Sequence, residues 1–218
     1  MMTMKYNEIL DYLDELLPNP RCELNYFNDY SLLIAIMLSA QTTDKRVNEV
    51  TKVLFSKYPS LKELKKANLD DVKKIIRPLG SFNKKAQNVL EIARILDEEY
   101  EGIVPQNRDI LETFPGVGRK TVNVFFAEYL NLPFIAVDTH VARVSKRLRL
   151  AKETDDVLII EKKLMKKFPR DCWAKLHLQL VLFGRYYCKA KNPECDNCKL
   201  KEMCSYYSKM QKKKKVLN

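Results

Sequence analysis

Four cysteines near the C-terminal end are the densest group of potential metal ligands in this chain. They are Cys188, Cys195, Cys198 and Cys204, with six, two and five residues between them. In a reducing compartment, thiols clustered in this way favour a metal or redox role over structural disulfides. Structural zinc usually pairs two short cysteine knuckles far apart in sequence, whereas only one two-residue gap occurs here. The spacing favours a [4Fe–4S] cluster, with tetrahedral zinc as the alternative.

The segment FPGVGRKT, residues 114–121, combines a tight turn with two cations. Pro115 should end the preceding helix, while Gly116 and Gly118 permit positive φ angles and a bare backbone. A helix that begins near Arg119 presents unpaired amide N–H groups, which can bind a phosphate oxygen. A plain turn between two helices would need neither both glycines nor Arg-Lys at the helix start. The pattern therefore favours a phosphate-binding turn.

Lys120 and Asp138 are the residues best suited to covalent chemistry. Lys120 lies in the first helical turn, where the helix dipole disfavours a cation and promotes loss of its proton. A neutral amine can form a Schiff base with a carbonyl or sugar C1′ carbon, although a further phosphate contact is the simpler role. Asp138 follows an apolar run, so its carboxylate could be partly desolvated and stabilise a positive charge. Its alternative role is to cap a helix over residues 139–150, and the two roles are compatible.

Helices are expected to position these residues. Apolar side chains recur at three-to-four spacing almost throughout, and few alternating runs typical of strands occur. The pattern predicts an all-α protein of about ten helices joined by short turns. Residues 77–89 share a glycine, a lysine and an Asn-Val pair with residues 114–124, at an offset that aligns Lys85 with Lys120. This suggests two helix–turn–helix units of one plan, with chance similarity as the alternative.

The net charge indicates the kind of partner to expect, and the N-terminal segment indicates where the protein is located in the cell. The formal net charge is +11, which suits a polyanion such as nucleic acid. Five lysines lie from Lys209 onward, and we expect QKKKKV to be a disordered, solubilising end. The N-terminal segment is polar and amphipathic, and the longest apolar run, residues 32–40, is too short to cross a bilayer. A soluble, intracellular protein without a membrane partner is expected.

In their order along the chain, these motifs resemble the endonuclease III family of helix-hairpin-helix DNA glycosylases. The resemblance rests on PGVGRKT, on VDTH beyond it, and on the C-x6-C-x2-C-x5-C end; LLIAIMLSAQTTD, GSFNKKA and HLQLVLFGRYYC extend it over nearly the whole chain. It implies an all-α, two-domain helix-hairpin-helix glycosylase fold. One domain would span residues 22–132, and residues 1–21 with 133–218 would form the other. The second domain would carry a [4Fe–4S] cluster loop at residues 188–204 and the basic tail.

The resemblance also implies a bifunctional base-excision-repair enzyme that removes oxidised pyrimidines. Lys120 matches the family's catalytic lysine, which attacks C1′ of a flipped-out nucleotide and forms a Schiff base that undergoes β-elimination. Asp138 matches the aspartate that assists it. The implied partner is double-stranded DNA containing damaged pyrimidines or abasic sites, bound by a monomer. The implied location is the cytoplasm, on the nucleoid if the source is prokaryotic.

Several further positions of this sequence match residues that contact DNA in the family. Gln41 matches the residue that fills the gap left by the flipped base. Residues 80–83 match a second intercalating loop, in which Ser81 stands where the best-known members have leucine. Serine is a poor apolar wedge, and Phe82 is the candidate to compensate. The expected DNA-binding residues are Gln41, Ser81, Phe82, Asn83, Gly116, Val117, Gly118, Arg119, His140, Lys189 and Lys191.

Two other functions remain open at this point. A monofunctional mismatch glycosylase looks similar around the cysteines but lacks the lysine, and its adenine-specific type has a long C-terminal extension. Lys120 and the short segment after Cys204 oppose that interpretation. A non-catalytic, metal-stabilised DNA-binding protein would share the basic surface, the hairpin and the metal. Lys120 and Asp138 would then serve only phosphate binding and capping.

Overall fold

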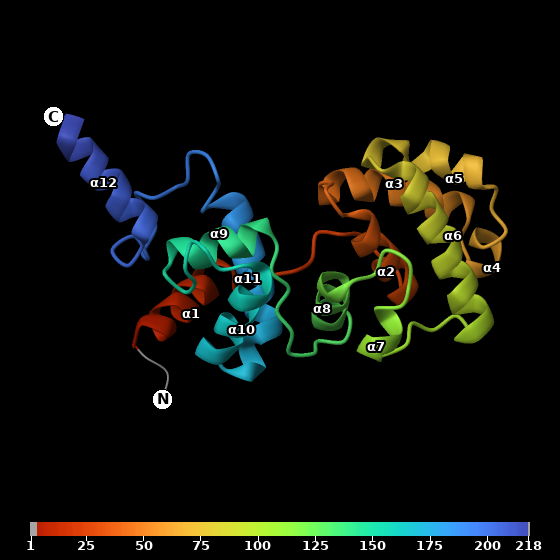
Figure 1. Ribbon diagram of the computed structural model, residues 1–218, viewed down its shortest axis with the longest axis horizontal. Coiled ribbons are helices and arrows are strands. Elements are labelled where there is room, and N and C mark those ends of the chain that lie inside the picture. Colours follow the sequence, from red (N-terminus) through yellow and green to blue (C-terminus); the bar gives the residue numbers. More distant parts are fainter. Residues whose placement is uncertain (1–3, 218) are drawn as a thin grey trace. The chain divides into compact units, whose positions relative to one another are not determined.

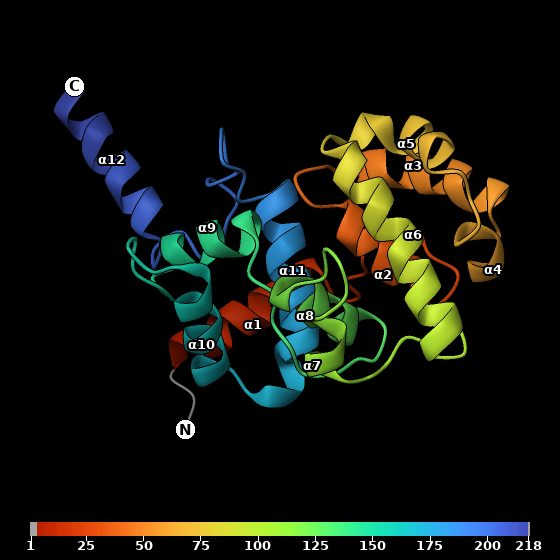
Figure 2. The same ribbon diagram turned by 45° about the vertical axis from the view of Figure 1, so that its right-hand side comes forward.

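The computed structural model describes the backbone of residues 4–217 and the side chains of residues 4–212. Within this part of the chain, every regular element is helical, and the predicted all-α class is confirmed (Figures 1 and 2). Residues 4–217 form twelve α-helices and two short 3₁₀-helices, whereas about ten helices were expected. The difference includes α4 and α7, which have four residues each and are too short to produce a periodic apolar pattern. None of the helices in residues 4–217 has the length and apolarity of a membrane span.

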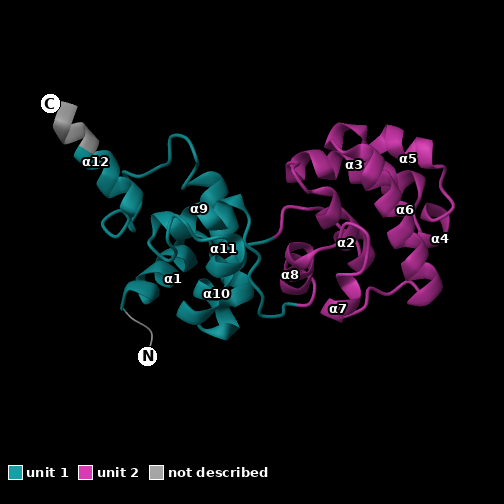
Figure 3. Cartoon of the chain, in the orientation of Figure 1, with its two compact units in different colours: residues 1–21, 131–218 teal, residues 22–130 magenta. Residues whose placement is uncertain are grey.

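The chain forms two compact units, coloured separately in Figure 3. Unit 2 comprises residues 22–130, and unit 1 comprises residues 1–21 and 131–218. The elements of unit 2 are α2 (Asp29–Leu38), α3 (Asp44–Lys57), α4 (Leu61–Leu64), α5 (Leu69–Ile76), η1 (Arg77–Leu79), α6 (Phe82–Glu99), α7 (Arg108–Leu111) and α8 (Arg119–Glu128). Those of unit 1 are α1 (Met4–Leu16), α9 (Thr139–Arg147), α10 (Val157–Lys167), η2 (Arg170–Cys172), α11 (Trp173–Tyr186) and α12 (Ser205–Leu217).

Helix α2 is the central helix of unit 2. Every residue after Asp29 is buried, as expected for a helix that is apolar all round. Its start is held by a capping box, in which Asn28 accepts from the Ser31 amide and the Ser31 hydroxyl accepts from the Asn28 amide. Helices α3, α6 and α8 pack against it. Helix α8 carries Lys120 and follows the turn of the FPGVGRKT segment at residues 114–121. Helix α2 therefore supports this candidate hairpin by packing against α8.

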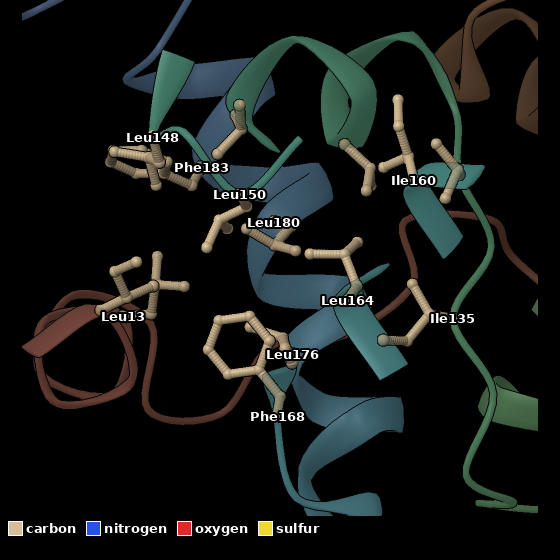
Figure 4. Packing of buried hydrophobic residues seen from close by; sticks show 14 of the residues in the cluster. Leu13, Ile135, Leu148, Leu150, Ile160, Leu164, Phe168, Leu176, Leu180 and Phe183 are labelled. Carbon is tan, nitrogen blue, oxygen red and sulfur yellow. The ribbon is translucent and has the colours of Figure 1, made fainter. Parts of the chain in front are cut away.

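The core of unit 1 lies between α1, α9, α10 and α11. Figure 4 shows Leu13, Leu164, Leu176 and Phe183 within one cluster of buried side chains. Helices α9 and α11 pack closely at Gly184, where an added Cβ would lie 2.9 Å from the Cβ of His140. Such close packing fixes α9, and therefore Asp138 at its start, against the body of the unit.

Helix α12 corrects the expectation of a disordered basic tail. Its backbone is helical through Leu217, and its first turn packs against α9. Beyond this turn, the part of α12 coloured as unit 1 in Figure 3 points away from the other helices of the unit in Figures 1 and 2. Lysine has good helix propensity, so a lysine run can continue a helix that has already begun at Ser205. The side chains of Lys213, Lys214 and Lys215 lie outside the described residues.

Candidate functional site

The segment between α7 and α8 forms the tight turn that the sequence predicts. Gly116 has a φ of 77°, in the left-handed region that favours glycine. An added Cβ there would overlap the side-chain amide of Asn88 and press on Met37. The amide of Val117 donates to the carbonyl of Phe114 at 3.1 Å, which closes the turn. Gly116 is therefore required both by backbone conformation and by space.

Gly118 differs from the expectation of a positive φ. Its φ of −117° and ψ of −179° are extended values that any residue can adopt. It is the N-cap of α8, it provides no side-chain cap, and an added Cβ would meet nothing within 4 Å. Neither conformation nor packing demands glycine here. The missing side chain instead leaves the space in front of the α8 N-terminus open to a ligand.

The two candidate catalytic residues occupy helix starts in different units. Lys120 is the second residue of α8 in unit 2, and its side chain is exposed. Asp138 in unit 1 is half-buried and caps α9, because its Oδ1 accepts from the Val141 amide at 2.8 Å. The predicted capping role is thus confirmed. Helix α9 ends at Arg147, three residues before the expected end, and Arg149 then takes a left-handed φ of 57°.

The residues expected to enter DNA lie on two loops of unit 2 and at the start of α6. Gln41, with a φ of 57°, and Ser81, with a φ of 45°, are both exposed and both left-handed. Asn83 is exposed, whereas Phe82 is half-buried at the first position of α6. Left-handed backbone is costly for side chains other than glycine, so both loops need support from their neighbours.

The remaining expected DNA contacts differ in accessibility. Arg119 is exposed, whereas Val117 is buried, with only 4 % of the residue exposed. In unit 1, His140 is half-buried and its Nδ1 lies 3.2 Å from Nη2 of Arg143. Lys189 pairs with Glu194 at 2.8 Å, and Lys191 is exposed.

All four clustered cysteines line one cavity of about 230 Å³ in unit 1. Its other walls include Tyr12, Phe183, Arg147 and Tyr206. Burial raises the pKa of the Cys195 and Cys198 thiols, and the neighbouring cysteines raise it further. Among the described residues, no three His, Cys, Asp or Glu side chains gather as ligands of a single metal ion. The four thiols thus border one shared cavity.

Arg147 holds the start of the cysteine loop. Its guanidinium donates to the carbonyls of Cys188 at 3.3 Å, Lys189 at 2.8 Å and Ala190 at 3.3 Å, and to the Cys188 sulfur at 3.3 Å. It also stacks 4.0 Å from the ring centroid of Tyr206. Arg143, one helical turn earlier, donates to the Cys188 carbonyl at 3.0 Å. Helix α9 thus carries Asp138 at its start and supports the cysteine loop from its later turns.

Sequence reasoning missed the supporting residues Lys85, Thr42, Arg143 and Arg147. The sequence shows each as an ordinary polar side chain on or near a helix. Their partners are distant in the chain; Lys85, for example, donates to the carbonyl of Ala40. The offset that aligns Lys85 with Lys120 was the only signal for Lys85. It did not indicate burial.

Comparisons with known proteins agree on one family. The family model described as "HhH-GPD superfamily base excision DNA repair protein" matches residues 34–170. Endonuclease III of Bacillus subtilis (strain 168) is 42% identical, with 98% of each chain covered. Endonuclease III of Escherichia coli (strain K12) is 40% identical over 96% of this chain and 99% of its own.

Solved structures give the same result. A non-covalent endonuclease III–DNA complex superposes with a TM-score of 0.91 at 42% identity, covering 97% of this chain and all of the other. A trapped endonuclease III–DNA covalent intermediate superposes with a TM-score of 0.90 at 42% identity, covering 96% and 100%. A thermostable thymine-DNA glycosylase shares the fold with a TM-score of 0.80 at 24% identity, over 94% of this chain and 97% of that one.

Proposed function

Because this chain belongs to the endonuclease III family of HhH-GPD superfamily base excision DNA repair proteins, we propose that it excises oxidised pyrimidines and then cleaves the strand. The observation that carries the proposal is the likeness over nearly the full chain to an endonuclease III trapped as a covalent DNA intermediate. A covalent intermediate requires a nucleophile, and the exposed Lys120 at the start of α8 is suited to that role. The substrate is double-stranded DNA that contains a damaged pyrimidine or an abasic site.

Lys120 performs the bond-breaking steps in this proposal. Its neutral Nζ attacks C1′ of the extruded nucleotide, and the glycosidic bond breaks with its electron pair leaving on the base. The amine loses a proton, and the C1′–O4′ bond then breaks as O4′ takes up a proton, which opens the sugar ring and gives a protonated Schiff base between Nζ and C1′. Removal of a proton from C2′ then expels the 3′ phosphate by β-elimination, and water releases the lysine. Extrusion comes first because C1′ is unreachable in a stacked duplex.

Asp138 assists through its charge. Its carboxylate is half-buried and one oxygen already accepts the Val141 amide, which fixes its orientation. A fixed carboxylate stabilises the positive charge that develops on the sugar as the base departs. The capping bond and the electrostatic role use the same side chain without conflict.

The turn before α8 is proposed to bind a backbone phosphate. Gly118 leaves the helix start open, and Arg119 adds a nearby cation. Such a contact positions DNA without reading its sequence. Gln41 and Ser81, together with Phe82 and Asn83, are proposed to occupy the gap left by the extruded nucleotide, with His140, Lys189 and Lys191 as further contacts to DNA.

The four cysteines are proposed to hold a [4Fe–4S] cluster. The support is that all four line one cavity, and that soft thiolates are the ligands such clusters use. When bound, the cluster would order the loop that carries Lys189 and Lys191, and no reaction step uses it. Metal analysis tests the proposal: iron and acid-labile sulfide support a cluster, whereas zinc in their place would overturn it.

Unit 2 and unit 1 are proposed to be the two domains of the family fold, and the protein is proposed to act as a monomer. Action on chromosomal DNA would place it in the cytoplasm, on the nucleoid in a prokaryote. Membership of the family and the proposed DNA substrate support these assignments.

Borohydride trapping tests the function directly. The protein is incubated with a thymine glycol duplex and with an abasic duplex, reduced, and assayed for a covalent adduct. We expect trapping with both substrates, and its loss in Lys120→Ala, because only a Schiff base is reduced to a stable bond. Asp138→Asn should slow excision by about 100-fold or more while leaving DNA binding intact, since it removes one charge from the transition state.

The alternatives give different results. Base release without any trapped adduct would identify a monofunctional glycosylase. Binding with neither release nor trapping would identify a non-catalytic DNA-binding protein. Lys84→Ala is the matched control, because Lys84 is an exposed lysine on α6 in the same unit.

A further inference from the structure

Lys85 is a buried lysine that the proposed reaction does not use. It is the fourth residue of α6 and only 6 % exposed. Its ammonium donates to the carbonyls of Ala40 at 2.8 Å and Leu79 at 2.9 Å, and to the Thr42 hydroxyl at 3.3 Å. An ammonium has three protons, so these partners match its hydrogen-bonding capacity. All three are neutral oxygens, and desolvation accordingly lowers the pKa of Lys85.

The partners of Lys85 belong to two separate loops. Ala40 and Thr42 flank Gln41, whereas Leu79 ends η1, directly before Gly80 and Ser81. The Thr42 hydroxyl also donates to the Leu79 carbonyl at 2.7 Å. One carbonyl and one hydroxyl therefore join the loops to each other, and the ammonium joins both to α6.

The same loops carry the strained residues Gln41 and Ser81. A left-handed backbone persists only where the surrounding structure holds it. The bonds of Lys85 end on residues beside Gln41 and two residues before Ser81. A purely apolar side chain at this position would remove the ammonium donor from both carbonyls. The Thr42 hydroxyl would still donate to Leu79, but the loops would lose their common bond to α6.

We propose that Lys85 is a positioning residue that locks the loop at residues 39–42 and the loop at residues 79–81 into one rigid element for entry into the duplex. The inference rests on the proposed function, in which Gln41 and Ser81 enter where the nucleotide leaves. Loops that are ordered in advance lose less conformational entropy when they insert. Lys85 therefore speeds extrusion of the damaged nucleotide, and it has no part in the chemistry at C1′.

Two substrates separate this role from general structural support. The first is a thymine glycol duplex with 2-aminopurine opposite the lesion, whose fluorescence rises when the loops unstack that base. The second is an abasic duplex with a one-nucleotide gap facing the abasic site, which offers the loops no base to displace. Lys85→Met keeps the length of the side chain and removes its donors. Lys84→Met, an exposed neighbour on α6, is the matched control.

With Lys85→Met, we expect the single-turnover excision rate on the intact duplex to fall by about 10- to 100-fold, because misplaced loops no longer open the stack. The fluorescence rise should be lost in parallel. Borohydride trapping on the gapped duplex should stay within about twofold of the wild-type rate, and Lys84→Met should resemble the wild type on both substrates.

Equal slowing of Lys85→Met on both substrates would overturn the proposal, and so would no slowing on either. If Lys85→Met does not fold, Thr42→Val decides: it removes the bond to Leu79 and should lower the fluorescence rise while sparing the gapped duplex. An unchanged fluorescence rise in Thr42→Val would then refute the lock between the loops. A wild-type protein that traps neither substrate would instead refute the proposed function.

Discussion

Gly116 and Gly118 lie two residues apart and meet different requirements. Gly116 needs its left-handed φ and has no room for a Cβ, whereas Gly118 has an ordinary extended backbone and open space. The first requirement comes from the fold of unit 2. The second is the one proposed to serve a ligand in front of α8. At the scale of single residues, the proposal therefore assigns stability to Gly116 and binding to Gly118.

This difference predicts opposite behaviour in two alanine variants. Gly116→Ala should destabilise the protein by about 1–3 kcal/mol, through backbone strain and the clash with Asn88. Gly118→Ala should leave the free energy of unfolding within about 0.5 kcal/mol, yet weaken binding to an abasic-site analogue duplex by about tenfold or more. Urea unfolding and fluorescence anisotropy measure the two quantities. Gly118→Ala binding with wild-type affinity would show that the space is not used by DNA.

At the scale of elements, helix α9 links the candidate catalytic aspartate to the cysteine loop. Asp138 caps its first turn, and Arg143 and Arg147 donate to loop carbonyls from later turns. The guanidinium of Arg147 is well suited to this because its rigid fork reaches several carbonyls at once. The loop therefore takes its position from a helix that is itself packed tightly on α11.

Arg147→Met should loosen the cysteine loop and speed loss of the proposed cluster. The substitution leaves the carbonyls of Lys189 and Ala190 without their donor, while the apolar stem is kept. Removal of a residue that supports metal ligands typically costs about 10- to 100-fold in metal retention, and we expect iron release to a chelator to accelerate by that amount. Arg149→Met, an exposed arginine just beyond α9, is the control. Equal release rates in the two variants would contradict the supporting role of Arg147.

At the scale of the whole molecule, positive charge should govern binding to undamaged DNA. The net charge is +11, and the sequence of α12 contains a run of four lysines near its end. Each phosphate neutralised by a lysine or arginine contributes about −0.9 to the slope of log affinity against log salt. Binding to undamaged duplex should therefore weaken steeply as salt rises.

An alanine variant of the tail tests whether the tail contributes to DNA binding. The variant replaces Lys212, Lys213, Lys214 and Lys215. If these lysines bind phosphates, the salt slope should become shallower by about one for each phosphate that is no longer neutralised. The excision rate at saturating protein should not change, because the proposed nucleophile is Lys120 and not a residue of the tail. Affinity titrations at several salt concentrations measure the slope. An unchanged slope in the variant would show that the tail does not bind DNA phosphates. If the affinity of the wild-type protein did not depend on salt, phosphate binding by any part of the protein would be contradicted.

Local features of the sequence determined much of this protein. The apolar periodicity indicated helices, and Pro115 with Gly116 indicated the turn before α8. Asp138 was readable as a cap because capping involves residues three apart. The order of these motifs indicated the family, which the comparisons confirm. Single-turn helices and the helical state of α12 were not predicted, since their local signals are weak or contrary.

Only the tertiary structure distinguished Lys85 from Lys120. The sequence aligns them at one offset in two similar segments, yet Lys120 is exposed at the second position of α8 and Lys85 is buried at the fourth position of α6. Local spacing reports which face a residue can occupy along its own helix. Burial depends on what packs there from elsewhere, and the loop that receives Lys85 lies 45 residues away in the chain. For this reason the candidate nucleophile could be found from the sequence, whereas the lysine proposed to organise the loops could not.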